Sequence, residues 1–358
     1  MINEQRKSNM ELLRLVLMFF ILMHHYLLKG GMNAGFQKDV DLNLLAAFLD
    51  PFFFVGVDCF VLISGYFGIR FKLKGLYKLF VQCAFYGLLF YLLHLCFDEA
   101  KLGKSIVDNF LLVFSTPPGW WFIRVYVYLY LLSPLLNMVI ENLSHSQFKL
   151  VLLILTVLNI YFGYLRQTPI NPDGYNTANF IFLYFIGRYI KLYCAKGCTK
   201  KYFLGYLFCC AIMGLIVDLK HTVLQVDSIL LNVHVYNNPL LIMASVFLLL
   251  TFASISIPFS KLINWLSFSA LSIYLITENS YFEQWYYPCV GNYIKGFTPL
   301  LSWSCLLVIA IITMICCILI DKIRLLITNQ ADRILLGVVD KLDTKCMNAW
   351  SGSNGNEA

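Results

Sequence analysis

The sequence predicts an all-α fold: a polytopic bundle of about ten transmembrane helices. Composition is the first observation, since 59% of the 358 residues are hydrophobic and 13% are charged, against roughly 25% charged residues in an average soluble domain. The second is a series of apolar runs of about 20 residues, the length needed to cross a bilayer. The third is aromatic clusters at the ends of such runs, Trp120-Trp121 and Trp285-Tyr286-Tyr287, where an aromatic belt meets the membrane surface.

The apolar runs give the ten expected helices. They span residues 10–28, 52–69, 76–97, 121–140, 148–165, 178–193, 202–218, 239–257, 264–282 and 299–320. No linker rich in Pro, Gly or Ser and no internal repeat divides them, so residues 1–328 are expected to form one domain. Residues 329–358 are expected to be a short cytoplasmic polar tail. The first run has no cleavage site after it, which favours a retained anchor over a signal peptide.

The basic residues predict the orientation of the bundle. The chain has 27 Lys and Arg against 20 Asp and Glu, an excess that could suggest a nucleic-acid partner. The basic residues lie mostly in the short loops, however, which disfavours such a partner. With the N-terminus inside, eighteen of the 27 fall on the cytoplasmic side and seven on the outer side. The positive-inside rule therefore predicts that both termini are cytoplasmic.

The twelve cysteines do not predict a metal site or a disulfide scaffold. Most lie inside apolar runs, and the nearest approach to a ligand pair, Cys194 with Cys198, has no matching second pair. No metal and no tightly bound cofactor are expected, and the sequence does not fix the oligomeric state.

Two polar residues on the first helix are the best candidates for chemistry. Arg14 and His25 are eleven residues apart, so they share one helix face and are separated along the axis by roughly 16 Å. Charged side chains on a membrane helix are functional candidates by default. The alternative is an ion pair between Glu11 and Arg14, with His24 and His25 as interfacial residues.

The second and fourth helices carry further polar residues. Asp58 is expected at a depth that lets its carboxylate orient the His25 imidazole, and Ser64 lies deeper, nearer Arg14. The alternatives are a neutralised acid at Asp58 and close helix packing at Ser64-Gly65. Arg124 follows Trp121 on the fourth helix, and its alternative is a side chain that only snorkels to the surface.

Four motifs give the chain a resemblance to acyltransferase family 3. They are Arg14-x10-His25, the run from Gly56 to Gly65, the stretch from Trp121 to Asn137, and Leu271-Ser272-Ile273-Tyr274-Leu275-Ile276. In the family, the last of these motifs, which lies in the ninth helix, often continues with a histidine where this chain has Thr277-Glu278. The resemblance covers residues 6 to about 320 and implies a bacterial inner-membrane enzyme that acylates, most often acetylates, exported glycans.

The resemblance implies roles for particular residues. His25 would be the general base for a sugar hydroxyl and Asp58 would orient it, while Arg14 would stabilise charge and contact the donor. Acetyl-CoA, or another acyl-CoA, would be the co-substrate. Its phosphates would be attracted by Arg14 and a basic loop that contains Arg70, Lys72 and Lys74. The candidates for binding substrate are Ser64, Arg124, Glu278 and Trp121.

The acceptor would be a lipid-linked or exported glycan. The outer loops offer only generic polarity for it, from Asn171, Asp173, Asp227, Asn237 and Asn238. Two other function classes remain open. A transporter or flippase for a lipid-linked glycan also needs buried charges, although no internal repeat supports it, and a structural membrane protein would use those charges only in pairs.

Overall fold

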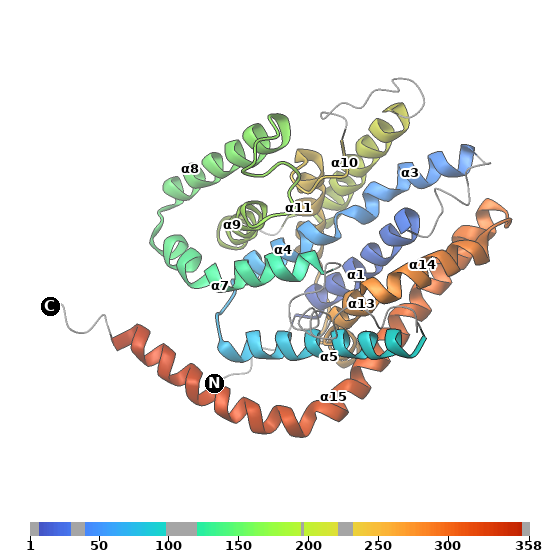
Figure 1. Ribbon diagram of the computed structural model, residues 1–358. Coiled ribbons are helices and arrows are strands. Elements are labelled where there is room, and N and C mark those ends of the chain that lie inside the picture. The colour runs from blue at the N-terminus through green and yellow to red at the C-terminus, as the bar shows by residue number, and fades with distance from the viewer. Residues whose placement is uncertain (1–6, 30–39, 98–119, 195–196, 221–231, 353–358) are drawn as a thin grey trace.

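The computed structural model describes residues 7–29, 40–97, 120–194, 197–220 and 232–352, which are mostly helical and contain no strand (Figure 1). The helices, in chain order, are α1 (Ser8–Lys29), α3 (Val40–Phe54), α4 (Gly56–Phe67), α5 (Leu73–Phe97), α7 (Trp121–Asn142), α8 (His145–Thr156), the π-helix η2 (Val157–Leu165), α9 (Thr177–Tyr193), α10 (Thr199–Leu219), α11 (Pro239–Ser254), α12 (Lys261–Ser267), α13 (Ala270–Thr277), α14 (Ser280–Ile294) and α15 (Pro299–Gly352).

A helical element lies at each of the ten expected positions. Seven segments of the described chain are long and apolar enough to cross a membrane: Ser8–Lys29, Leu45–Phe67, Leu73–Leu93, Trp121–Asn142, His145–Leu165, Thr199–Leu219 and Pro299–Asn329. Pro239–Ser254 and Lys261–Thr277 are shorter apolar helices. The chain is therefore a multi-pass membrane protein with a helical bundle, as the composition predicts.

Three elements differ from the expected ones. The second helix was expected to begin at residue 52, but the apolar span begins at Leu45 and carries Asp50 inside it. The ninth was expected to be continuous over 264–282, but it is broken into α12 and α13, and α14 begins separately at Ser280. The tenth helix was expected to end at residue 320, but α15 continues through the expected tail to Gly352 and is drawn as the long curved helix in Figure 1.

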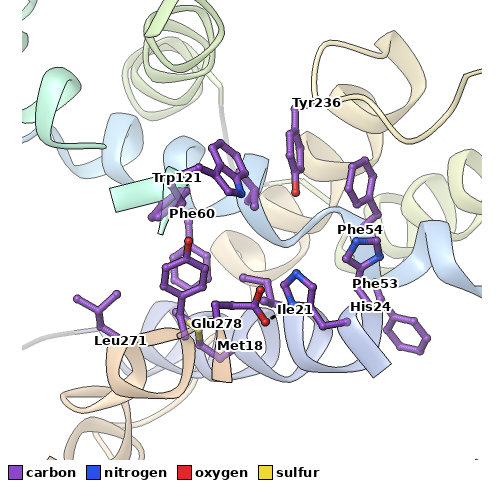
Figure 2. Close-up of a pocket in the computed structure, with 14 residues that line it drawn as sticks. Met18, Ile21, His24, Phe53, Phe54, Phe60, Trp121, Tyr236, Leu271 and Glu278 are labelled. Atoms are coloured by element: carbon purple, nitrogen blue, oxygen red, sulfur yellow. Dashed lines mark ion pairs between the residues drawn. The ribbon is translucent and has the colours of Figure 1, made fainter. Parts of the chain in front are cut away.

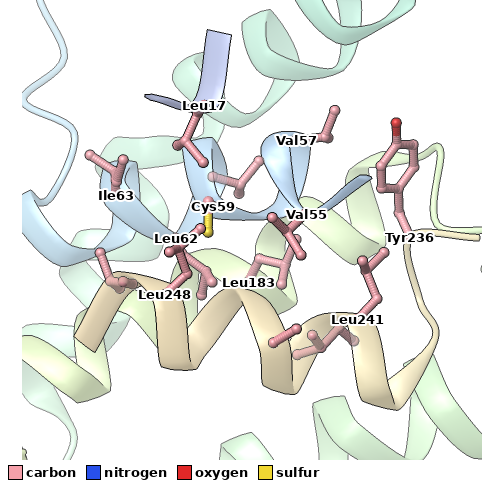
Figure 3. Close-up of a cluster of buried hydrophobic side chains, with 14 of the residues drawn as sticks. Leu17, Val55, Val57, Cys59, Leu62, Ile63, Leu183, Tyr236, Leu241 and Leu248 are labelled. Carbon is pink, nitrogen blue, oxygen red and sulfur yellow. The ribbon is translucent and has the colours of Figure 1, made fainter. Parts of the chain in front are cut away.

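Helix α4 lies at the centre of the bundle, where it packs against α1, α9 and α11 (Figure 3). Two glycines allow the closest approach. A Cβ atom on Gly65 would lie 2.2 Å from the carbonyl oxygen of Tyr184, and one on Gly187 would lie 2.2 Å from that of Leu62. Small residues permit such contact between membrane helices. Gly65 thus serves close packing of α4 on α9, the alternative considered for the Ser64-Gly65 pair.

Candidate active site

His25 pairs with Glu278. The His25 Nδ1 atom lies 3.0 Å from Glu278 Oε1, and the two side chains are 16% and 4% exposed. Nδ1 makes no aligned hydrogen bond, a feature common to catalytic contacts before substrate binds, which tighten in the complex. Glu278 comes from the break between α13 and α14. The next residue, Asn279, caps α14 by accepting a hydrogen bond from the Tyr281 backbone N–H, which fixes where the chain turns.

Two further donors hold the Glu278 carboxylate. Lys29 Nζ lies 2.6 Å from Oε2, and the Tyr287 hydroxyl donates to Oε1 at 2.7 Å. Lys29 also binds Glu283, with 2.5 Å between Nζ and Oε2. Hydrogen bonds from charged donors are short and strong, so Lys29 and Tyr287 fix the carboxylate beside the imidazole in its ionised form.

A small, mostly aromatic cavity lies beside the pair. Its volume is about 40 Å³, which is room for only two or three water molecules. Its lining comprises Met18, Ile21, His24, His25, Phe53, Phe54, Val57, Phe60, Trp121, Phe122, Tyr236, Leu271, Tyr274 and Glu278. Trp121 and Tyr236 face Glu278 across it (Figure 2). Burial raises the pKa of Tyr236 well above its usual value, so its hydroxyl stays protonated at neutral pH.

A second cluster of histidine and carboxylate lies next to the first. Asp50 accepts hydrogen bonds from His24 Nδ1 at 2.7 Å and from His234 Nε2 at 2.8 Å. It lines a separate cavity of about 180 Å³ with these two histidines. Both histidines of the first helix are therefore paired with carboxylates rather than only wetted at the interface.

A large basic cavity lies at the other end of α1. Its volume is about 660 Å³, and it is lined by Lys7, Glu11, Arg14, Phe67, Gly68, Ile69, Arg70, Asn137, Glu141, Arg188 and Lys191. Five of these residues are basic and two are acidic, so the cavity suits a polyanion. Arg14 lines it while ion-paired with Glu11, so the ion pair and a place in a cavity are both observed.

A hydrogen-bond chain positions Arg70 at this cavity. The Asn137 side chain donates to the Ile69 carbonyl at 2.8 Å, and the Tyr184 hydroxyl donates to Asn137 at 2.6 Å. The Ile69 backbone N–H in turn donates to the Tyr184 hydroxyl at 3.0 Å. Gly68, with φ of 74°, makes the turn that leads out of α4. The last residue of the third motif, Asn137, thus has a structural role in shaping the basic cavity.

The two ends of α1 face different sides of the bundle. The basic cavity gathers the N-terminal end of α1 and the C-terminal ends of α4, α7 and α9. The predicted threading requires this, because α1 crosses in one direction and the other three cross in the opposite one. About 16 Å of helix separates Arg14 from His25.

The structure corrects the expected partner of His25. Asp58 is fully buried, and neither of its carboxylate oxygens has a hydrogen-bond partner. Asp58 lies in the first turn of α4, whereas the acid that contacts the imidazole is Glu278. The prediction matched Asp58 to His25 by depth alone, and depth does not fix which helix face an acid occupies.

The other candidates divide between the cavities and the surface. Trp121 and Glu278 line the cavity beside His25, and Arg70 lines the basic cavity. Ser64 lines none of the three cavities and donates to the Phe60 carbonyl within its own helix at 3.0 Å. Two candidates, Arg124 and Lys72, are exposed away from the cavities, and Lys74 is half-buried outside them.

The outer-loop asparagines are structural. Asn237 donates from its side chain to the Asn171 carbonyl at 2.6 Å, and Asn171 donates to Asn159 at 2.6 Å. The side chain of Asn238 caps α11 by accepting from the Leu240 backbone N–H at 2.8 Å. All three loop asparagines are buried, so they are not free to bind sugar. Asp227, expected in the same set, lies outside the described residues.

Four contributors to these clusters had no catalytic or binding role predicted from the sequence: Lys29, Asp50, His234 and Tyr287. The acid at Asp50 carried a usable signal, since it lies inside an apolar span once that span is taken to start at Leu45. His234 comes from an irregular segment before α11 and has no periodic pattern around it.

These features define a multi-pass membrane protein whose first helix carries a histidine–carboxylate pair at one end and an arginine in a basic cavity at the other. The model of acyltransferase family 3, described as an acyltransferase domain, matches residues 7–322. The chain belongs to this family and is a membrane acyltransferase. No curated protein and no solved structure matched the chain. Family membership favours acyl transfer over the transporter or flippase alternative.

Proposed function

We propose that the protein transfers an acyl group, most simply acetyl, from acyl-CoA to a hydroxyl of a lipid-linked or exported glycan. The observation that carries the proposal is the His25–Glu278 contact at 3.0 Å beside a small aromatic cavity. The bacterial inner membrane is the location that the family resemblance implies. Such a membrane separates acyl-CoA inside from exported glycan outside, which suits a bundle with cavities at both ends of α1.

His25 acts as the general base. Its Nδ1 faces the Glu278 carboxylate, which leaves Nε2 to accept the proton of the acceptor hydroxyl. The hydroxyl oxygen then attacks the thioester carbonyl, an ester bond forms, and the carbon–sulfur bond breaks. The imidazolium returns its proton to the departing CoA thiolate. Glu278 stabilises the imidazolium during this sequence, as the carboxylate of a catalytic triad does.

The basic cavity supports acyl-CoA as the donor. The phosphates of CoA are a polyanion, and the guanidinium groups of Arg14, Arg70 and Arg188 in this cavity suit phosphate oxygens. The thioester end of the donor would reach along α1 toward His25, over about 16 Å.

The experiment uses purified full-length protein in a detergent without a sugar headgroup. The donor is radiolabelled acetyl-CoA, and the acceptor is the surface glycan fraction from a strain that lacks the protein. We expect label on the glycan with wild type and a loss of about 10²-fold or more with His25→Ala. His145→Ala is the matched control, because His145 is exposed and stacks on Tyr193, away from the three cavities.

Two outcomes would count against the proposal. Absence of label on the glycan with wild-type protein would refute acyl transfer to this acceptor class. Substantial transfer by His25→Ala, at normal abundance, would remove His25 as the base.

A further inference from the structure

Asp50 joins two histidines from different parts of the chain. His24 comes from α1, Asp50 from α3 and His234 from the segment that precedes α11. The side chains of His24 and Asp50 are 11% and 9% exposed, whereas that of His234 is 41% exposed. The cluster therefore runs from the interior of the bundle to an open edge, and its cavity of about 180 Å³ is large enough for a small ligand group.

This cavity adjoins the one beside His25. His24 and Phe54 line both, and the ring centroids of His24 and His25 are 5.3 Å apart. A group bound at the Asp50 cluster would therefore lie next to the proposed base. The basic cavity, in contrast, lies about 16 Å away along α1.

The lining of this cavity selects against charged ligands. Among the described residues that line it, none is Lys or Arg, and the single acid, Asp50, is already paired with two histidines. Aromatic faces come from Phe54 and Tyr175. A few convergent polar groups within an apolar, aromatic wall are typical of a site for an uncharged polar ligand.

Each imidazole keeps one ring nitrogen for a ligand. His24 uses Nδ1 and His234 uses Nε2 to bind Asp50. His24 Nε2 and His234 Nδ1 remain, and a neutral imidazole nitrogen accepts a hydrogen bond from a hydroxyl while a protonated one donates to it. Two such nitrogens around one cavity suit a ligand with several hydroxyl groups.

The His234 segment is held firmly in place over α3. Tyr236 stacks on Phe54 with ring centroids 4.6 Å apart, and its backbone N–H donates to the Asp173 carbonyl at 2.8 Å. Gly174, with φ of 83°, approaches so closely that a Cβ atom there would lie 2.5 Å from the Asn237 nitrogen. The site is thus preorganised, which reduces the entropy lost when a ligand binds.

We propose that the cavity lined by His24, Asp50, His234 and Tyr175 is the acceptor subsite, and that it binds an uncharged, hydroxyl-bearing sugar unit. The subsite holds one sugar hydroxyl beside His25 through hydrogen bonds from the Asp50 cluster. This assignment rests on the proposed function, because it names the place of the acceptor in that reaction.

The test is a kinetic split between acceptor and donor. The probe is the unacylated surface glycan fraction described above, titrated against purified full-length protein with saturating acetyl-CoA, and then the reverse titration. Asp50→Asn and His234→Ala are expected to raise the KM for the glycan about tenfold or more, the effect of losing a hydrogen bond to a charged or buried group. The KM for acetyl-CoA should stay at the wild-type value.

Two control variants frame the result. His145→Ala should leave both KM values unchanged. Lys191→Gln, in the basic cavity, should raise the KM for acetyl-CoA and not that for the glycan. If Asp50→Asn fails to accumulate, His234→Ala decides, since the His234 side chain is 41% exposed and that of Asp50 only 9%.

The outcomes separate the two proposals. Wild-type protein that transfers no label refutes the proposed function itself. Active wild type with an unchanged glycan KM in Asp50→Asn and His234→Ala overturns the acceptor subsite alone. An equal rise in both KM values also overturns it, because the cluster would then support the fold rather than the acceptor.

Discussion

Replacing Glu278 with glutamine tests the catalytic pair by removing one charge and almost no volume. The substitution takes away the carboxylate that lies 3.0 Å from His25 Nδ1 and that accepts from Lys29 and Tyr287. Lys29 keeps Glu283 as a partner at 2.5 Å, so no buried cation is left unpaired. The protein is therefore expected to fold and insert normally.

The magnitude follows from the contact that is lost. The contact is expected to tighten into a hydrogen bond when substrate binds. Such a bond to a charged group contributes about 1.5–3 kcal/mol, and Glu278 is only 4% exposed, so water does not screen it. At about 1.4 kcal/mol per factor of ten, loss of this support for the imidazolium lowers kcat by about 10- to 100-fold. The KM for acetyl-CoA should change little, because Glu278 lies far from the basic cavity.

The assay is transfer of radiolabelled acetyl from acetyl-CoA to the surface glycan, with Asp58→Asn as the matched variant. Asp58 is also a buried acid, but its carboxylate has no hydrogen-bond partner. An unpaired buried carboxylate is unfavourable, so Asp58→Asn should leave kcat close to wild type and the stability equal or higher. A larger loss in Asp58→Asn than in Glu278→Gln would refute the assignment of Glu278.

Three further predictions concern the basic cavity, the packing of α4 and the support of Glu278. Arg14→Ala should raise the KM for acetyl-CoA several-fold at low salt and less at high salt, because ions screen the charges of the partly exposed cavity. If the KM were independent of salt in both wild type and variant, Arg14 would only pair with Glu11. Gly65→Ala places a Cβ atom 2.2 Å from the Tyr184 carbonyl oxygen. It should lower the free energy of unfolding by about 1–3 kcal/mol, which is measured as a lower Tm in detergent. Gly337→Ala, with nothing within 4 Å, is its control and should not lower the Tm; equal Tm values would contradict the close packing. Lys29→Gln should lower kcat about tenfold without changing either KM, and Lys29→Arg should restore most of it; an unaffected rate would show that Tyr287 alone holds Glu278.

Much of the fold was predictable because lipid imposes a strong pattern on the sequence. Each crossing needs a long apolar run, so helices were found at all ten expected positions. The broken ninth segment was less accessible. The polar run Thr277-Glu278-Asn279-Ser280 interrupts its apolar residues, but the break between α13 and α14 depends on a local cap at Asn279 that periodicity does not show.

The site was predictable only along a single helix. The spacing of Arg14 and His25 places them at opposite ends of one face, and the structure has them in separate cavities. Partners on other helices were not accessible in the same way. Asp58 and Glu278 are both acids within apolar surroundings, and only the packing of α13 against α1 brings Glu278, rather than Asp58, to the imidazole.

The cluster at Asp50 shows the same limit more strongly. It combines α1, α3 and an irregular segment near residue 234, and the distance between these residues in the sequence carries no signal of contact. Buried asparagines at positions 171 and 237 fix that segment, although in the sequence they suggested exposed loop polarity.

The most direct measurement of transfer through the bundle uses proteoliposomes that contain the purified protein. Radiolabelled acetyl-CoA is enclosed in the lumen, and the unacylated glycan is supplied only outside. With the cavity proposed for the donor at one end of α1 and the subsite proposed for the acceptor at the other, wild-type protein should place label on the external glycan, and His25→Ala should not. Transfer that occurs only when acetyl-CoA and glycan are on the same side of the membrane would contradict this arrangement.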